Sequence, residues 1–173
     1  GMNFTAFNSS IPPVSERATA EAARRWDDIA KPIGSLGALE TAVTRMAGVM
    51  DTPKVRLNKR AVLVLCADNG VCRQGVAQTP VHITGVMSAF IAKHRSSVCI
   101  MADYARADVI PVDMGLMRAV DEPRLIRRRI ADGTSDFTLG PAMTADEAER
   151  AIEAGMALAD DCKRAGYDIL LTG

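Results

Sequence analysis

The sequence predicts an α/β fold: a three-layer, mainly parallel, Rossmann-like sheet with helices on both faces. Three observations carry this prediction. Short apolar runs of strand length end on glycine and lack the polar alternation of a half-exposed strand. Segments with helical periodicity and N-cap residues lie between these runs. Such alternation of helix and strand indicates parallel strands that are joined by right-handed crossovers.

Length and composition are those of an ordinary globular domain. The chain has 173 residues, 48% of them hydrophobic, with 21 basic and 21 acidic side chains. This size is large enough to bury a substantial core. The balanced charge argues against a nucleic-acid or membrane-surface partner, and neither a long apolar run nor a signal pattern occurs. We therefore expect a cytoplasmic protein with no nucleic-acid and no membrane partner.

The four cysteines and two histidines show no spacing typical of a metal site. Reduced thiols in a cytosolic protein are the simplest interpretation. The sequence therefore predicts neither a metal site nor a bound cofactor.

Residues 1–58 are expected to form a small N-terminal segment of an arm and helices. A Pro-Pro pair at 12–13 prevents a helix throughout residues 2–13, which we expect to reach out as an extended arm. Ser15 is a suitable N-cap for a helix that runs to about Ala30.

A loop with two glycines and a proline follows at residues 31–37 and leads into a second helix, which ends near Met50. A Gly/Ser turn at a helix start presents free N–H groups, and Lys31 could add positive charge. The loop is therefore a candidate anion site, although such turns more often have only a structural role.

The α/β sheet domain is expected over residues 59–173. Its first strand is the apolar run 61–67, which stops on Asp68, Asn69 and Gly70. Ligands of open α/β sheets bind outside the carboxyl ends of the strands, so Asp68 and Asn69 are candidate binding residues. An alternative of equal weight is that these two side chains do no more than satisfy backbone groups of the turn.

A long loop, residues 71–80, connects this strand to the next helix, and long loops in compact domains are often functional. Thr79 is expected to be the N-cap of that helix, with Pro80 at its first position. A further helix is expected to begin at Ser96 or Ser97. The first of these helices carries apolar residues at helical spacing, which we interpret as a core face: Ile83, Val86, Met87, Phe90 and Ile91.

Residues 108–115 are expected to form the second parallel strand, and Pro111 suggests that this strand lies toward an edge. The run repeats the pattern of the first strand, because an acidic residue, Asp113, precedes its final glycine. Two acidic residues at the ends of two parallel strands would converge on one rim of the sheet. This convergence strengthens the prediction of a site for both Asp68 and Asp113.

The remaining elements complete the alternation. Residues 124–130 are expected to form a further strand, whose four arginines we interpret as a solvated edge and, less readily, as an anion site. Thr144 and Glu147 form a capping box for a long helix that ends near Ala165. Residues 168–173 are one more buried strand.

Five segments are similar in order and approximate spacing to motifs of the nicotinate-nucleotide:dimethylbenzimidazole phosphoribosyltransferase family. The resemblance covers nearly all of this chain but only about the N-terminal half of that family, so the sheet is expected to be incomplete relative to the family. The matching segments are residues 31–40, 64–71, 75–80, 112–115 and 140–143.

The resemblance implies a pentosyltransferase reaction in cobalamin lower-ligand assembly. Phosphoribosyl is transferred from nicotinate mononucleotide to 5,6-dimethylbenzimidazole, which gives α-ribazole phosphate and nicotinate. The family's base is a glutamate of its C-terminal half, so this chain is expected to be a truncated member that is inactive alone. The resemblance also implies a homodimer.

The resemblance further implies contacts with the aromatic base for Thr79 and Met87. The family usually has glutamine at the position of Met87 and histidine at that of Asn69, so both positions depart from the pattern. These departures slightly favour an alternative, a non-catalytic aromatic-base or nucleotide-binding module. A generic nucleotide-binding domain is disfavoured, because neither glycine-rich phosphate motif occurs.

Overall fold

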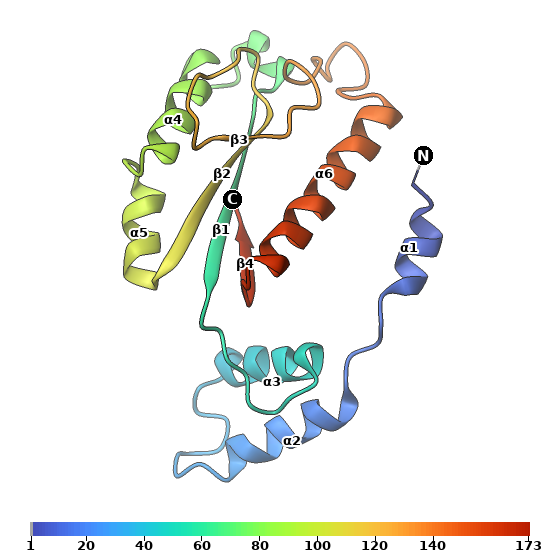
Figure 1. The fold of residues 1–173 in the computed structure, drawn as a ribbon, viewed down its shortest axis with the longest axis vertical. Coiled ribbons are helices and arrows are strands. Elements are labelled where there is room, and N and C mark those ends of the chain that lie inside the picture. Colours follow the sequence, from blue (N-terminus) through green and yellow to red (C-terminus); the bar gives the residue numbers. More distant parts are fainter. Residues whose placement is uncertain (1) are drawn as a thin grey trace. The chain divides into compact units, whose positions relative to one another are not determined.

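The computed structural model describes residues 2–173, which divide into two compact units, residues 2–57 and 58–173 (Figure 1). Each unit is described by itself. Within the described residues, no helix is both long and apolar enough to cross a membrane.

The first unit contains three helices: α1 (Phe4–Ser10), α2 (Glu16–Asp27) and α3 (Ala38–Met50). The expected extended arm is therefore wrong for residues 4–10. The side chain of Asn3 accepts a hydrogen bond from the Ala6 N–H at 3.0 Å and starts a helix, which ends before the Pro-Pro pair. Ser15 caps α2 as expected, by accepting a hydrogen bond from the Ala18 N–H.

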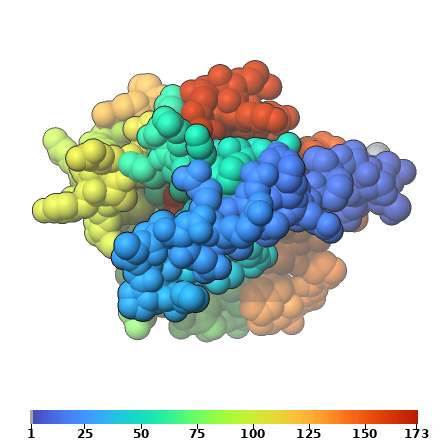
Figure 2. Space-filling view, turned by 90° about the horizontal axis from the view of Figure 1, so that it is seen from below, coloured from blue at the N-terminus to red at the C-terminus, as the bar shows by residue number. Residues whose placement is uncertain are grey.

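Helices α2 and α3 approach closely through small side chains. Ala18 and Ala47 are fully buried, and a Cβ at Gly48 would lie 2.4 Å from the Thr19 Oγ1. The Ser15 N–H also donates to the Gly48 carbonyl at 2.9 Å. Figure 2 shows the surface of this unit, with the N-terminal residues in blue.

The loop before α3 is held by an internal ion pair. Lys31 Nζ lies 2.7 Å from Glu40 Oε1, and both side chains are almost nine-tenths buried. Glu40 also accepts a hydrogen bond from the Leu36 N–H at 3.0 Å. The hydrogen bond from Lys31 holds the pKa of Glu40 below its usual value. Lys31 thus neutralises a carboxylate of its own chain, which weakens the interpretation of this turn as an anion site.

The second unit contains a parallel four-stranded sheet in the order β3-β2-β1-β4. The strands are β1 (Arg60–Ala67), β2 (Ala107–Gly115), β3 (Ile126–Arg127) and β4 (Ile169–Thr172). The α/β class predicted from the sequence is confirmed. Burial of β1 on both faces holds only in part, because Leu65 is 40% exposed while Ala61 and Leu63 are buried.

Helices cover both faces of this sheet (Figure 1). Helices α4 (His82–Ala92) and α5 (Ser97–Ala105) connect β1 to β2, and α6 (Ala145–Arg164) connects β3 to β4. The β1-to-β2 and β3-to-β4 connections run in opposite directions across the sheet, and right-handed crossovers of opposite direction place their helices on opposite faces. The strand order changes direction at β1, so a ligand crevice is expected at the carboxyl end of that strand.

The start of α4 differs from the sequence prediction. The helix begins at His82 rather than after Thr79, and its N-cap, Val81, makes no side-chain capping bond. Pro80 lies before the helix and accepts a hydrogen bond from the Ile83 N–H with its carbonyl, so it does not occupy the first helical position. Thr79 lies in an irregular, exposed segment.

The core face of α4 also differs from the prediction. Its fully buried residues are small, Ser88 and Ala92, whereas Val86, Met87 and Phe90 are each more than 40% exposed. Ala92 joins Cys66, Leu116 and Leu125 in the apolar core beneath the sheet. Close packing against the strands selects small side chains, a preference that the apolar periodicity does not reveal.

The edge at β3 explains Pro111. This strand is only two residues long and pairs with Val112 and Asp113 alone. Pro111 therefore lies on a part of β2 that β3 does not reach, and a residue without an N–H is tolerated there.

Side-chain hydrogen bonds join the segments that lead into β1, β2 and β4 at the amino-terminal end of the sheet. The Tyr167 hydroxyl donates to Asp108 at 2.7 Å, and Asp168 accepts hydrogen bonds from the Asn58 and Lys59 N–H groups. Lys59 Nζ lies 4.3 Å from the centre of the Tyr167 ring. The hydrogen bond to Asp108 raises the pKa of Tyr167 to about 12, so the phenol stays protonated and continues to donate.

The capping box of α6 is present, because Thr144 and Glu147 each accept a hydrogen bond from the backbone N–H of the other. The helix nevertheless contains Gly155 in its interior, and no atom beyond the adjacent residues and the helix's own backbone lies within 4 Å of a Cβ placed there. We expect Gly155→Ala to raise the free energy of unfolding by about 0.5–1 kcal/mol, since alanine restricts the unfolded chain and favours helix. Urea unfolding followed by circular dichroism measures this change, and a lower midpoint would contradict it.

Candidate functional site

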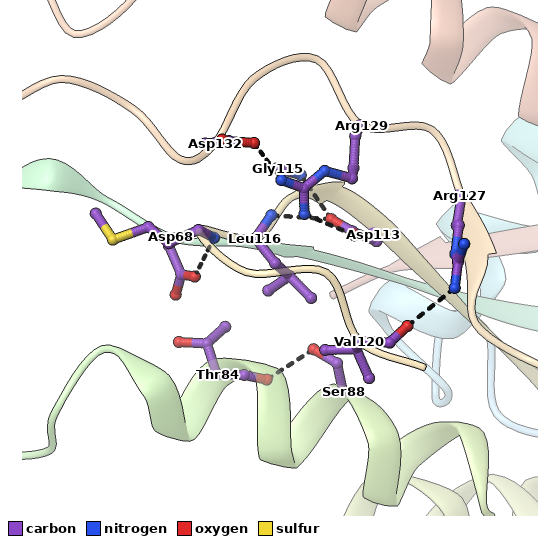
Figure 3. A network of polar contacts seen from close by, with 11 residues as sticks. Asp68, Thr84, Ser88, Asp113, Gly115, Leu116, Val120, Arg127, Arg129 and Asp132 are labelled. Atoms are coloured by element: carbon purple, nitrogen blue, oxygen red, sulfur yellow. Dashed lines mark hydrogen bonds and ion pairs between the residues drawn. The ribbon is translucent and has the colours of Figure 1, made fainter. Parts of the chain in front are cut away.

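The structure brings Asp68 and Asp113 to the same rim, at the carboxyl ends of β1 and β2 (Figure 3). Both side chains are buried, with 5% and 2% of their surface exposed. The register of the two strands explains their proximity, because Asp113 pairs with Cys66, two residues before Asp68. Their hydrogen bonds nevertheless give them different roles.

Asp113 braces its own turn. One carboxylate oxygen accepts hydrogen bonds from the Gly115 and Leu116 N–H groups at 3.0 and 2.9 Å. The other oxygen lies 3.4 Å from the guanidinium of Arg129, which also pairs with Asp132. Both carboxylate oxygens of Asp113 thus have partners within the chain. Asp113 therefore fits the alternative in which these acidic residues only satisfy groups of the turn.

Only one of the two carboxylate oxygens of Asp68 accepts a hydrogen bond from a described residue. Its Oδ2 accepts a hydrogen bond from the Met117 N–H at 2.7 Å, and its backbone carbonyl accepts one from the Thr134 N–H at 3.0 Å. The second carboxylate oxygen, Oδ1, accepts no hydrogen bond from any described residue. Figure 3 shows the carboxylate directed from the end of β1 toward α4.

A cavity of about 600 Å³ lies where this carboxylate points, and we call it the α4 cavity. Its walls come from one face of α4 and from residues 117–120 of the loop that follows β2. Most of the lining surface is apolar, and Asp68, His82 and Arg118 are its charged or titratable members. Pockets of this size with mostly apolar walls and few polar groups are typical small-molecule sites.

The α4 cavity includes only some of the candidate binding residues. Asp68 lines it, whereas Asn69, Thr79 and Met87 are not among its lining residues. Asn69 and Thr79 are exposed, and Met87 is 43% exposed on a neighbouring face of α4. The contacts that the resemblance implies for Thr79 and Met87 therefore remain predictions about the adjoining surface.

Sequence reasoning missed most of the lining residues. Those on α4 have a helical spacing of three and four, which predicts a shared face: His82, Gly85, Val86 and Ala89. Gly85 and Ala89 in this set are small and leave room for a cavity. Small residues do not contribute to the pattern of bulky apolar residues that predicts a buried helix face. No sequence signal marks residues 117–120, which form a loop.

Two titratable side chains close to this rim, Cys66 and Asp136, have shifted pKa values. Burial raises the pKa of the Cys66 thiol, which keeps it protonated, and all four cysteines are free. The hydrogen bond from Gln74 holds the pKa of Asp136 below its usual value, so this neighbouring loop is braced by a carboxylate. Within the described residues, no cluster of three or more metal-ligating side chains occurs.

Comparison with known proteins matches residues 11–173 to a family profile described as Phosphoribosyltransferase. The chain belongs to this phosphoribosyltransferase family. Membership confirms the resemblance found in the five sequence motifs.

Named members of the phosphoribosyltransferase family are similar over almost the whole chain. The chain is 34% identical over 163 residues to a nicotinate-nucleotide–dimethylbenzimidazole phosphoribosyltransferase of Clostridium tetani, covering 94% of the chain and 45% of that protein. It is 40% identical over 164 residues to an enzyme of the same name from Chloroflexus aggregans, covering 94% and 46%. The chain thus spans about half the length of the curated relatives it matches.

A solved phosphoribosyltransferase structure shares the fold. The nicotinate-nucleotide–dimethylbenzimidazole phosphoribosyltransferase of Thermus thermophilus matches with a TM-score of 0.85 and 33% identity, over 92% of this chain and 48% of that one. This agreement extends the fold assignment from the sheet alone to nearly all of the described residues.

Proposed function

We propose that this chain binds the aromatic base in a phosphoribosyl transfer from nicotinate mononucleotide to 5,6-dimethylbenzimidazole. The observation that carries the proposal is the α4 cavity, which lies at the carboxyl end of β1 in a chain of the phosphoribosyltransferase family. The strand order changes direction at β1, which is where ligands of this fold class bind. We assign the chain the binding of the base and not the whole reaction, because it spans about half of its relatives.

The lining of the cavity suits a flat, weakly polar ring. Val86, Ala89 and Val120 present apolar surface, and Gly85 lets α4 approach the loop, since a Cβ there would lie 3.3 Å from a Val120 methyl group. Burial of a ring between such walls excludes water and restricts its orientation. In the proposed reaction, one ring nitrogen then attacks C1 of the ribose while nicotinate leaves, and orientation of that nitrogen lowers the entropic cost.

Filling the cavity tests this proposal. We expect Ala89→Trp to weaken binding of 5,6-dimethylbenzimidazole at least about tenfold, because an indole occupies the space that the ligand needs. Isothermal titration calorimetry with the full 173-residue chain measures the affinity. A matched control is Ala159→Trp, which places the same side chain at an exposed position of α6 outside the cavity lining.

The two variants separate the possible outcomes. Loss of binding in Ala89→Trp with retention in Ala159→Trp would support the α4 cavity as the base site. Equal binding by both variants would contradict it and favour the surface around Thr79 and Met87. Release of nicotinate from nicotinate mononucleotide, measured with and without the benzimidazole, reports whether the chain alone also turns substrate over.

A further inference from the structure

A further cavity lies wholly within the first unit, between α2, α3 and the segment that follows α3. Its volume is about 320 Å³, and we call it the Trp26 cavity. Its charged lining residues are three cations, Arg25, Lys54 and Arg56, and no acidic side chain of the described residues lines it. Like charges that face one small space repel one another, so an anion in this cavity is electrostatically favoured.

The three cations have no counter-ion within the described residues. Their side chains form no ion pair and donate no hydrogen bond there. Carboxylates of the same unit pair elsewhere, since Glu21 and Asp51 both bind Arg17, at 3.2 and 3.0 Å. Arg25 also borders a separate hollow that contains Glu21 and Asp28, but it forms an ion pair with neither. A bound anion would therefore supply charge that the chain does not.

The rest of the lining is apolar and includes an aromatic ring. Trp26 is held from outside the cavity, because Lys31 Nζ lies 5.7 Å from the centre of its ring and is itself fixed by Glu40. Lys31 does not line the cavity, so the cavity meets a different part of the indole. Ile29 and Val43 extend this apolar surface. An indole that is already in place lowers the entropic cost of packing a second ring against it.

We propose that the Trp26 cavity binds a nucleoside 5′-monophosphate, with the phosphate on the three cations and the base against Trp26. A phosphate monoester carries about two negative charges at pH 7, and guanidinium groups bind phosphate oxygens in pairs. The base provides the flat surface that the apolar part of the lining matches. The volume of about 320 Å³ lies within the range of small-molecule pockets. This site goes beyond the proposed function, because it uses another unit of the chain and another class of ligand.

The chain contains its own reporter for this cavity. Trp26 is the only tryptophan, so the tryptophan fluorescence of the full 173-residue chain reports on this position alone. We expect AMP to quench it saturably, and adenosine, which lacks the phosphate, to bind at least about tenfold more weakly. Inorganic phosphate should also bind more weakly than AMP, because it lacks the ring. N-acetyltryptophanamide at the same ligand concentrations corrects for absorbance and collisional quenching.

A pair of variants assigns the binding to the cavity. We expect Arg56→Gln to weaken AMP binding about tenfold, because it removes one of the three cations. The matched control is Arg45→Gln, which removes the same charge from an exposed position of α3 outside the cavity lining. At physiological salt this control should stay within about twofold of the wild-type affinity, since distant surface charges are screened. Arg56 is exposed as well, so both variants are expected to fold, which circular dichroism checks.

Each outcome decides the inference. Saturable quenching that requires the phosphate and weakens in Arg56→Gln but not in Arg45→Gln would support it. No saturable quenching by AMP, equal binding of adenosine, or an equal loss in both variants would overturn it. Inorganic phosphate that competes as tightly as AMP binds would overturn the role of the ring. 5,6-Dimethylbenzimidazole has no phosphate and is assigned to the α4 cavity, so its binding tests the proposed function separately.

Discussion

Asp113→Ala is expected to lower the free energy of unfolding of the sheet unit by about 3–5 kcal/mol. The substitution leaves the Gly115 and Leu116 N–H groups without their acceptor in a site where Asp113 is 2% exposed. It also removes one of the two carboxylates that hold Arg129, whose side chain is 24% exposed. Because an unsatisfied buried donor loses its hydration without compensation, most of the loss comes from the two N–H groups.

Urea unfolding followed by circular dichroism measures this loss, and two further variants assign its cause. Asp113→Asn keeps one acceptor oxygen and should lose less stability than alanine. Asp132→Ala removes the other partner of Arg129, but that side chain is 79% exposed, so a change within about 0.5 kcal/mol is expected. A similar loss for Asp132→Ala and Asp113→Ala would show that the ion pair, and not the backbone bracing, determines stability.

Gly70→Ala is expected to cost about 2–3 kcal/mol, because the added methyl group meets backbone that cannot move aside. A Cβ at Gly70 would lie 2.5 Å from the Thr134 carbonyl oxygen, 2.6 Å from the Ser135 carbonyl carbon and 2.7 Å from the Asp136 nitrogen. These atoms belong to the loop that also donates the Thr134 N–H to Asp68. The substitution should therefore displace this loop as well as lower stability.

The matched control for Gly70→Ala is Gly140→Ala, since nothing lies within 4 Å of a Cβ at Gly140. We expect a change within about 0.5 kcal/mol for this control in the same urea experiment. A stability of Gly70→Ala equal to that of the control would mean that the two loops separate more readily than their contact distances indicate.

Most of the fold follows from local signals in the sequence. The apolar runs that end on Gly115 and Gly173 mark strands, and the capping box at Thr144 marks α6, because each of these patterns reports the immediate neighbourhood of the residue. The error at residues 4–10 has the same origin. The Pro-Pro pair does prevent a continuous helix, but Asn3 supplies a cap that suffices for a short one.

The candidate site was harder to predict because its geometry depends on contacts between distant segments. The sequence places Asp68 and Asp113 at strand ends, yet it does not show which carboxylate braces a turn and which retains a free oxygen. That difference depends on Met117 and Arg129, which reach the rim from loops without a sequence signal. The face of α4 that borders the cavity was likewise hidden, because small residues such as Gly85 and Ala89 carry no apolar signal.

The hydrogen bonds at the amino-terminal end of the sheet affect how the protein tolerates substitutions. Tyr167 with Asp108, and Asp168 with the Asn58 and Lys59 amides, close that end through contacts that involve no residue of the α4 cavity. At the opposite end, Asp68 both braces a turn and lines the α4 cavity. A substitution at the amino-terminal end of the sheet is therefore expected to change stability alone, whereas one at the carboxyl end is expected to change stability and the shape of the cavity together.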